Sequence, residues 1–389
     1  MNENIKYNYE ITILARVAVF AVFLTNLSQL PFFVTSGITQ YISYPVWIVV
    51  FISCFLHTLL NKRVFLSSQI KTIMLLILSI CILQLIFGLI SGNAYFNSSL
   101  FQYLMFSFAI FLCGNVMGDS INQKNIEGIA YAFIISTFIV EINVYINFFA
   151  SINAFSQKLF AYSSKNSVSL LIVTALILSC CFVHIKSKLY KIFNIAFIGS
   201  SLLILFLLKS RASIFGFLLA IIVFMFSKVT NPKIKKWFWI AALFSILLLI
   251  FNGNFYEIVV KNVFLANNEY GDLNAITSGR MNLFRSYPGL INGHLLEGIG
   301  PYYFECAPLS AILQFGIIIG STYIAIMFYP FFSTAKSRKR NELMFLVFLI
   351  SIVFCSNAFF EGLAPFGPGA KCFFLWFIWG IVLKQKNIE

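Results

Sequence analysis

Four basic residues have the types and spacing that best suit chemistry in this chain. Lys209 and Arg211 stand between two apolar stretches, and Arg280 and Arg285 lie in a long polar segment further on. A guanidinium group is a rigid fork of donors that holds a carboxylate or phosphate by two bonds. The polar segment, residues 252–305, has three basic residues against five acidic ones, so it is not a diffuse basic patch. We therefore expect these arginines to act individually, as clamps on an anion.

Each of these positions also has a plainer interpretation. Lys209 and Arg211 could extend toward lipid headgroups from the ends of apolar helices, and this carries equal weight with an anion site. His294, alone in the polar segment, is more simply a solvated loop histidine. Glu141 lies inside an apolar stretch, where a carboxylate is costly. It is either functional or held by a partner on a neighbouring helix.

Two glycine patterns are open in the same way. Residues 298–301 read Gly-Ile-Gly-Pro, a tight turn whose backbone N–H groups could hold phosphate, although a plain turn is the simpler interpretation. Gly316 and Gly320 have the small-xxx-small spacing that lets two helices approach closely. We expect a packing role for this second pattern.

The elements that must position these residues are membrane helices. The chain has 389 residues, of which 60% are hydrophobic and 10% charged, and its mean hydropathy is +0.90. Soluble domains have about 25% charged residues. The fold class predicted is all-α, a polytopic membrane protein. A net charge of +14 usually suggests nucleic acid, but here the charge must first be divided between two sides of a bilayer, and we expect no nucleic-acid partner.

Twelve apolar segments approach the roughly 20 residues that cross a bilayer. They cover residues 11–27, 43–60, 72–90, 100–117, 128–150, 168–185, 192–208, 212–226, 237–252, 307–331, 343–359 and 372–384. Placing both termini in the cytoplasm puts about two thirds of the basic residues there, as the positive-inside rule requires. The outer side then holds Lys158, Lys165, Lys209, Arg211, Lys261, Arg280, Arg285 and Lys371. We expect one membrane domain, residues 1–389, with residues 252–305 as its large extracytoplasmic loop.

Residue inventory argues against metal-dependent chemistry. Only Asp119 and Asp272 are aspartates, so no Asp-x-Asp pair is present to hold the divalent ion of a nucleotide-sugar transferase. The eight cysteines form no Cys-x-x-Cys pair, and the histidines do not cluster. We therefore predict no metal and no cofactor.

Three short motifs, taken in order, resemble the O-antigen polymerase and O-antigen ligase superfamily. They are Leu-Lys-Ser-Arg-Ala-Ser at 208–213, Ser-Gly-Arg-Met-Asn-Leu-Phe-Arg at 278–285, and Gly-Ile-Gly-Pro-Tyr-Tyr-Phe at 298–304. Asn166, at the start of an apolar segment, resembles a further feature of that family. The resemblance covers about residues 160–325 and includes the layout of twelve spans.

The resemblance implies a bacterial inner-membrane enzyme, a metal-independent glycosyltransferase. It would join undecaprenyl-pyrophosphate-linked repeat units into O-antigen or a related polysaccharide at the periplasmic face. A chain-length regulator and a flippase would be its protein partners. Arg211, Arg280 and Arg285 would stabilise the leaving pyrophosphate, with Lys209 as a weaker fourth group. Glu305 is the first choice as proton acceptor for the attacking hydroxyl, ahead of His294 and then Asp272.

Two alternatives stay open. Ligases of that superfamily, which attach glycan to lipid A core, have a histidine in the approach to the span after the large loop. This chain has Glu305 in that place, which favours a polymerase, although His294 is near in sequence. A flippase for the same lipid-linked glycan is the second alternative. It should have two similar halves and charges lining a central cavity, and neither is evident in the sequence.

Overall fold

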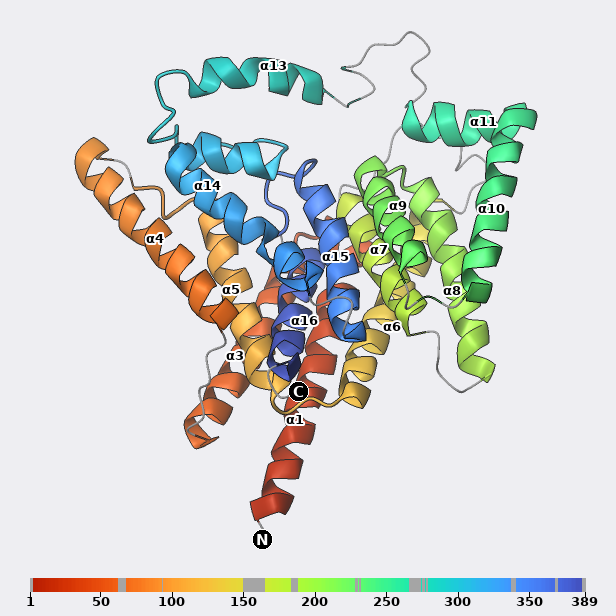
Figure 1. The fold of residues 1–389 in the computed structure, drawn as a ribbon, viewed down its shortest axis with the longest axis horizontal. Coiled ribbons are helices and arrows are strands. Elements are labelled where there is room, and N and C mark those ends of the chain that lie inside the picture. The colour runs from red at the N-terminus through yellow and green to blue at the C-terminus, as the bar shows by residue number, and fades with distance from the viewer. Residues whose placement is uncertain are drawn as a thin grey trace.

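The computed structural model describes residues 3–61, 68–92, 94–149, 165–182, 188–227, 230, 232–265, 274, 277, 279–336, 341–367 and 370–386. Within these ranges every regular element is a helix, so the all-α prediction is confirmed (Figure 1). The long helices are α1 (Glu3–Leu27), α3 (Thr39–Asn61), α4 (Ser68–Ser91), α5 (Ser99–Gly118), α6 (Gln123–Phe148), α7 (Lys165–Cys181), α8 (Lys188–Leu207), α9 (Arg211–Phe226), α10 (Pro232–Phe251), α14 (Ala307–Ala335), α15 (Glu342–Ala358) and α16 (Ala370–Lys386). A short helix, α2 (Pro31–Thr35), joins α1 to α3.

Six helices in the described ranges are long and apolar enough to cross a membrane. They are Thr39–Leu60, Ser68–Ile90, Ser99–Gly118, Gln123–Phe148, Tyr190–Leu207 and Ala307–Ala335. Shorter apolar helices occupy the other six predicted segments. These helices indicate a membrane protein, while the number of twelve crossings stays a prediction. The start of α1 and the end of α16 both lie toward the lower end of the bundle (Figure 1).

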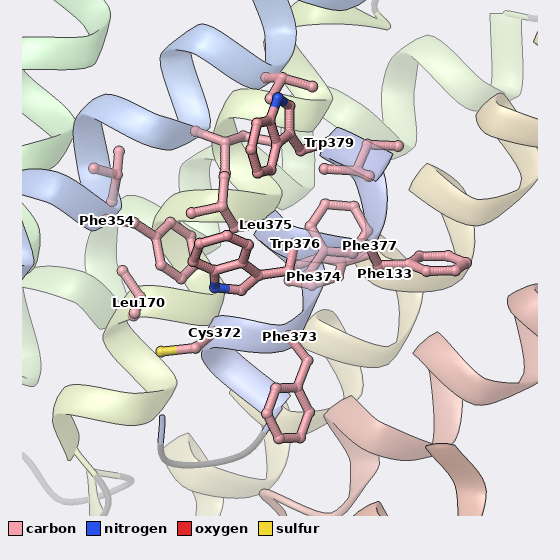
Figure 2. Packing of buried hydrophobic residues seen from close by; sticks show 14 of the residues in the cluster. Phe133, Leu170, Phe354, Cys372, Phe373, Phe374, Leu375, Trp376, Phe377 and Trp379 are labelled. Carbon is pink, nitrogen blue, oxygen red and sulfur yellow. The ribbon is translucent and has the colours of Figure 1, made fainter. Parts of the chain in front are cut away.

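The last long helix, α16, forms the centre of the bundle. Its residues from Cys372 to Leu383 are buried on every side, and α1, α5, α7 and α15 surround it. A helix that is apolar all round is stable only when it is enclosed in this way. Phe133 of α6, Leu170 of α7 and Phe354 of α15 pack around its aromatic side chains (Figure 2).

Glycines let α5 and α16 approach each other closely. A Cβ atom at Gly114 would lie 2.2 Å from the carbonyl oxygen of Phe377, and one at Gly380 would lie 2.3 Å from that of Phe111. Gly118, one turn after Gly114, approaches the carbonyl oxygen of Ile381 in the same way. The small-xxx-small packing of two long helices therefore occurs at Gly114 and Gly118, not at the predicted pair in α14.

Helix α14 covers the apolar segment predicted at 307–331, but it is broken near its start, at Gly316. Gly316 has φ 77° and ψ 172°, which only glycine adopts without strain. A Cβ at Gly320 would lie 2.6 Å from Cα of Ile312, because the two parts of the helix fold toward each other. The first part thereby stays at the end of the bundle that carries the polar segment.

The predicted loop 252–305 contains helices of its own. They are α11 (Gly253–Tyr256), a π-helix η1 (Glu257–Phe264) and α13 (Arg280–Ile291). In Figure 1, α13 lies across the upper end of the bundle. Its apolar side packs on a small cluster formed by Phe304, Cys306 and Leu313, separate from the main core. This contact places Arg280, the first residue of α13, at the end of the bundle.

A buried glutamine fastens α5 to α14 beneath this end. Ser98 caps the start of α5, because its hydroxyl accepts a hydrogen bond from the backbone N–H of Leu100. The same hydroxyl donates to Oε1 of Gln314 at 2.6 Å. The amide nitrogen of Gln314 donates to the carbonyl of Tyr302 and to the hydroxyl of Ser310, each at 2.9 Å. Every polar atom of this side chain is used, so the segment before α14 has a fixed position.

Candidate anion site

Four separate parts of the chain meet at the upper end of the bundle. They are the start of α7, the turn between α8 and α9, the segment from Gly279 to Cys306, and the connection between α15 and α16. Hydrogen bonds and charge interactions join their polar residues into one group, which we call the basic cluster. Its members are Lys165, Asn166, Lys209, Ser210, Arg211, Arg280, Glu305 and Glu361.

Asn166, in the first turn of α7, connects three of these parts. Its Nδ2 donates to Oε1 of Glu361 at 2.8 Å. Its Oδ1 lies 3.3 Å from the hydroxyl of Ser210, which immediately precedes α9 and also lies 3.1 Å from the hydroxyl of Ser213. An amide side chain can donate and accept at once, which is what this position requires. Asn166 thus links the start of α7 to the turn before α9 and to the connection between α15 and α16.

Arg280 joins α13 to the cluster. Its Nε lies 2.8 Å from Oε2 of Glu305, although the N–H is not aligned for a hydrogen bond, so the contact is an ion pair. Its terminal nitrogen donates to the carbonyl of Phe360 at 3.1 Å, and the guanidinium lies 5.8 Å from the centre of the Phe360 ring. The side chain is 21% exposed and that of Glu305 is 38% exposed, so the pair is partly open to solvent.

The positive charges are close enough to act on one another. Burial lowers the pKa of Lys165, and the charges of Arg211 and Arg280 lower it further. Burial and the charge of Lys165 likewise lower the pKa of Lys209, and burial and the charge of Arg280 lower that of Arg211. Four cations and two carboxylates, Glu305 and Glu361, thus leave an excess of positive charge. A bound anion would relieve the repulsion among these cations.

The backbone at Lys209 is strained. Its φ is 50°, in the left-handed region that costs a residue with a side chain about 1–2 kcal/mol. Only Leu208, Lys209 and Ser210 separate α8 from α9, and the N–H of Lys209 donates to the carbonyl of Phe206 at 3.1 Å. The short turn therefore imposes this conformation. It holds Lys209 beside Arg211 at the same end of two adjacent helices.

The other predicted site residues lie apart from the cluster. Arg285 is exposed on α13, five residues after Arg280 and therefore about 140° further round the helix. His294 is half exposed, and its Nδ1 lies 3.2 Å from Oε1 of Glu297. Among the described residues it makes no contact with Glu305 or Arg280. Asp272 lies outside the described residues.

The Gly-Ile-Gly-Pro turn is not a phosphate cradle. The N–H groups of Ile299 and Gly300 donate to the carbonyls of Leu313 and Gln314 at 2.8 and 3.1 Å, and the N–H of Gly298 donates to the carbonyl of His294. The turn therefore pairs with the first part of α14 before its break. The plain structural interpretation of this motif is correct, because its N–H groups are already used.

Lys165 and Glu361 complete the cluster, and the sequence reasoning did not select either as a site residue. Lys165 counts there only as one of several basic residues on the outer side. Glu361 directly follows an apolar segment in Phe-Phe-Glu-Gly, and a carboxylate at that end of a span was the available signal.

Among the described residues, no three His, Cys, Asp or Glu side chains gather as metal ligands. A search of family models and of curated proteins finds no match for this chain.

Proposed function

We propose that this protein polymerises undecaprenyl-pyrophosphate-linked oligosaccharide repeat units into O-antigen or a related surface polysaccharide. In this proposal it spans the bacterial inner membrane twelve times, with both termini in the cytoplasm. Reaction occurs at the periplasmic end of the bundle. The observation that carries the proposal is the convergence of Lys165, Lys209, Arg211 and Arg280 at one end of an apolar helical bundle.

The proposed reaction needs what this cluster offers. The bond between the anomeric carbon of the donor and the pyrophosphate oxygen breaks, and the electron pair stays on that oxygen. Fixed cations that already lie at the leaving group stabilise this charge without a metal. The hydroxyl of the acceptor forms the new bond and gives up its proton, and Glu305 is the proposed acceptor of that proton. Ion pairing with Arg280 holds Glu305 beside the leaving group.

The ligase alternative is weaker because ligases of that superfamily have a histidine near the reacting groups. His294 pairs with Glu297 on an exposed turn, and it lies apart from the cationic side chains. His294 therefore remains only the second choice as a proton acceptor. Arg285, exposed on α13, becomes the weakest member of the proposed clamp.

The test is a set of single substitutions in the native host, followed by gel analysis of surface glycan and extraction of lipid-linked intermediates. For Arg211→Ala and Arg280→Ala we expect lipid A core with at most one repeat unit. A ligase would instead leave bare core while polymer accumulates on the carrier lipid. Loss of a flippase would trap single repeat units on the cytoplasmic side. Wild-type ladders from both variants would refute the proposal.

A further inference from the structure

An exposed tyrosine beside the basic cluster has no role in the proposed clamp. Tyr303 lies two residues before Glu305, in the segment between α13 and α14, and it is 59% exposed. The ring is nevertheless anchored, because a Cβ at Gly362 would lie 3.1 Å from its Cε2 atom. One side of the ring is thus fixed, and the rest faces outward.

The segments that carry Tyr303 and Glu361 are held tightly together. A Cβ at Gly362 would lie 2.2 Å from the carbonyl oxygen of Phe304, so only glycine allows this approach. Beyond Gly362 the connection is buried, with the hydroxyl of Ser107 donating to the carbonyl of Phe366 at 2.8 Å. A rigid support of this kind is what a binding group requires.

Charged groups act on the Tyr303 hydroxyl. Burial raises the pKa of its hydroxyl, and the negative charges of Glu361 and Glu305 raise it further, whereas the charge of Arg280 acts in the opposite direction. The hydroxyl therefore stays protonated, with both carboxylates of the cluster near it. Glu305, two residues after Tyr303, pairs with the guanidinium that the proposed clamp uses.

An aromatic face next to carboxylates suits a sugar. A pyranose ring has faces of C–H bonds, which pack on an aromatic ring, and a rim of hydroxyls, which donate to carboxylates. In a glycan pyrophosphate a single oxygen joins the first sugar to the phosphate, so this sugar must lie next to the group that binds the phosphate. Tyr303 lies two residues before Glu305, whose carboxylate is 2.8 Å from Nε of Arg280.

We propose that the exposed face of Tyr303 is the stacking surface for the sugar attached to the pyrophosphate, with Glu305 and Glu361 accepting hydrogen bonds from its hydroxyls. This inference rests on the proposed function, because it takes a glycan pyrophosphate as the ligand. The competing role for an exposed tyrosine is an aromatic anchor at the membrane interface. Tyr41 of α3, 71% exposed, serves as the control for that role.

The test compares two probes on the purified full-length protein in lipid nanodiscs. One is geranylgeranyl pyrophosphate, which has no sugar, and the other is the lipid-linked repeat unit extracted from host cells that lack this protein. For Tyr303→Ala we expect about tenfold weaker binding of the glycan-bearing probe and unchanged binding of the sugar-free probe. Tyr303→Phe and Tyr41→Ala should bind both probes as the wild type does.

Three results would overturn the stacking surface and leave the clamp intact. The first is wild-type affinity of Tyr303→Ala for the glycan-bearing probe. The second is an equal loss for both probes in Tyr303→Ala, which would make Tyr303 a structural residue, and the third is an equal loss in Tyr41→Ala, which would make it an interfacial one. If Tyr303→Ala does not fold, Tyr303→Leu, which keeps bulk without an aromatic face, takes its place. Failure of the proposed function is distinct, since Arg211→Ala would then bind the sugar-free probe as well as the wild type.

Discussion

Carboxylates occupy two very different regions of this molecule. At the upper end of the bundle, Glu305 and Glu361 lie among four cations and are partly exposed. Inside the bundle, Glu141 of α6 is fully buried, accepts a hydrogen bond from Ser201 of α8 at 2.7 Å, and makes no ion pair with a described residue. The comparison teaches that position relative to the cations, and not residue type, distinguishes the two kinds of carboxylate, and only Glu305 and Glu361 fit the proposed reaction.

The largest expected effect comes from removing a cation of the cluster. For Arg280→Ala we expect loss of about 100-fold or more in polymer formed, because a fixed charge at the leaving group is lost. Arg280→Lys should recover only part of it, since lysine cannot make a bidentate contact. Pulse labelling of polysaccharide in host cells measures the rate. Arg285→Ala, on the exposed side of the same helix, is the comparison variant and should cost much less, and an equal loss there would mean that Arg285 belongs to the clamp as fully as Arg280.

A second, smaller effect tests the hydrogen bond between Asn166 of α7 and Glu361. Asn166→Asp places a second carboxylate 2.8 Å from Glu361, and repulsion should separate α7 from the connection between α15 and α16. We expect roughly tenfold to 100-fold lower polymer formation with the fold retained. Asn166→Gln is the control variant, since it keeps the amide group. Polymer formation near wild type in Asn166→Asp would exclude a positioning role for Asn166.

Some features of the fold and of the basic cluster could be predicted from the sequence, and others could not. Hydropathy predicts helices in all twelve segments, since a lipid-facing helix has a strong and local composition signal. The break in α14 could not be predicted, because Gly316 acts only when the chain at Leu295 folds back to receive the N–H of Ile317. Lys209, Arg211 and Arg280 could be selected because positive charge on the outer side is unusual. Glu361 had one sequence signal, a carboxylate directly after an apolar segment, but its place in the cluster depends on Asn166, 195 positions away in the sequence.

Backbone strain at Lys209 offers a third and smaller test. Lys209→Gly removes the charge and relieves the left-handed backbone, whereas Lys209→Ala removes the charge and keeps the strain. We expect both variants to lose affinity for geranylgeranyl pyrophosphate equally, about threefold to tenfold. The glycine variant should be more stable by about 1 kcal/mol in thermal unfolding. If both variants bound geranylgeranyl pyrophosphate as the wild type does, Lys209 would be a headgroup anchor. The cluster would then have three functional cations.

The smallest effect is expected at Glu141, and it tests the other side of the comparison. Glu141→Gln keeps the side-chain shape and the acceptor for Ser201, and no described cation loses a partner. Stability should therefore change by no more than about 1 kcal/mol, and polymer formation should stay near wild type. Glu141→Ala should lower the free energy of unfolding by about 2–3 kcal/mol, because it leaves a cavity and an unpaired hydroxyl at Ser201.

Glu305→Gln, the same exchange in the cluster, should reduce polymer formation while leaving stability almost unchanged, since the pair with Arg280 is partly exposed. If Glu141→Gln stopped polymer formation while Glu305→Gln did not, the functional carboxylate would lie within the bundle, and the distinction between the two regions would be reversed.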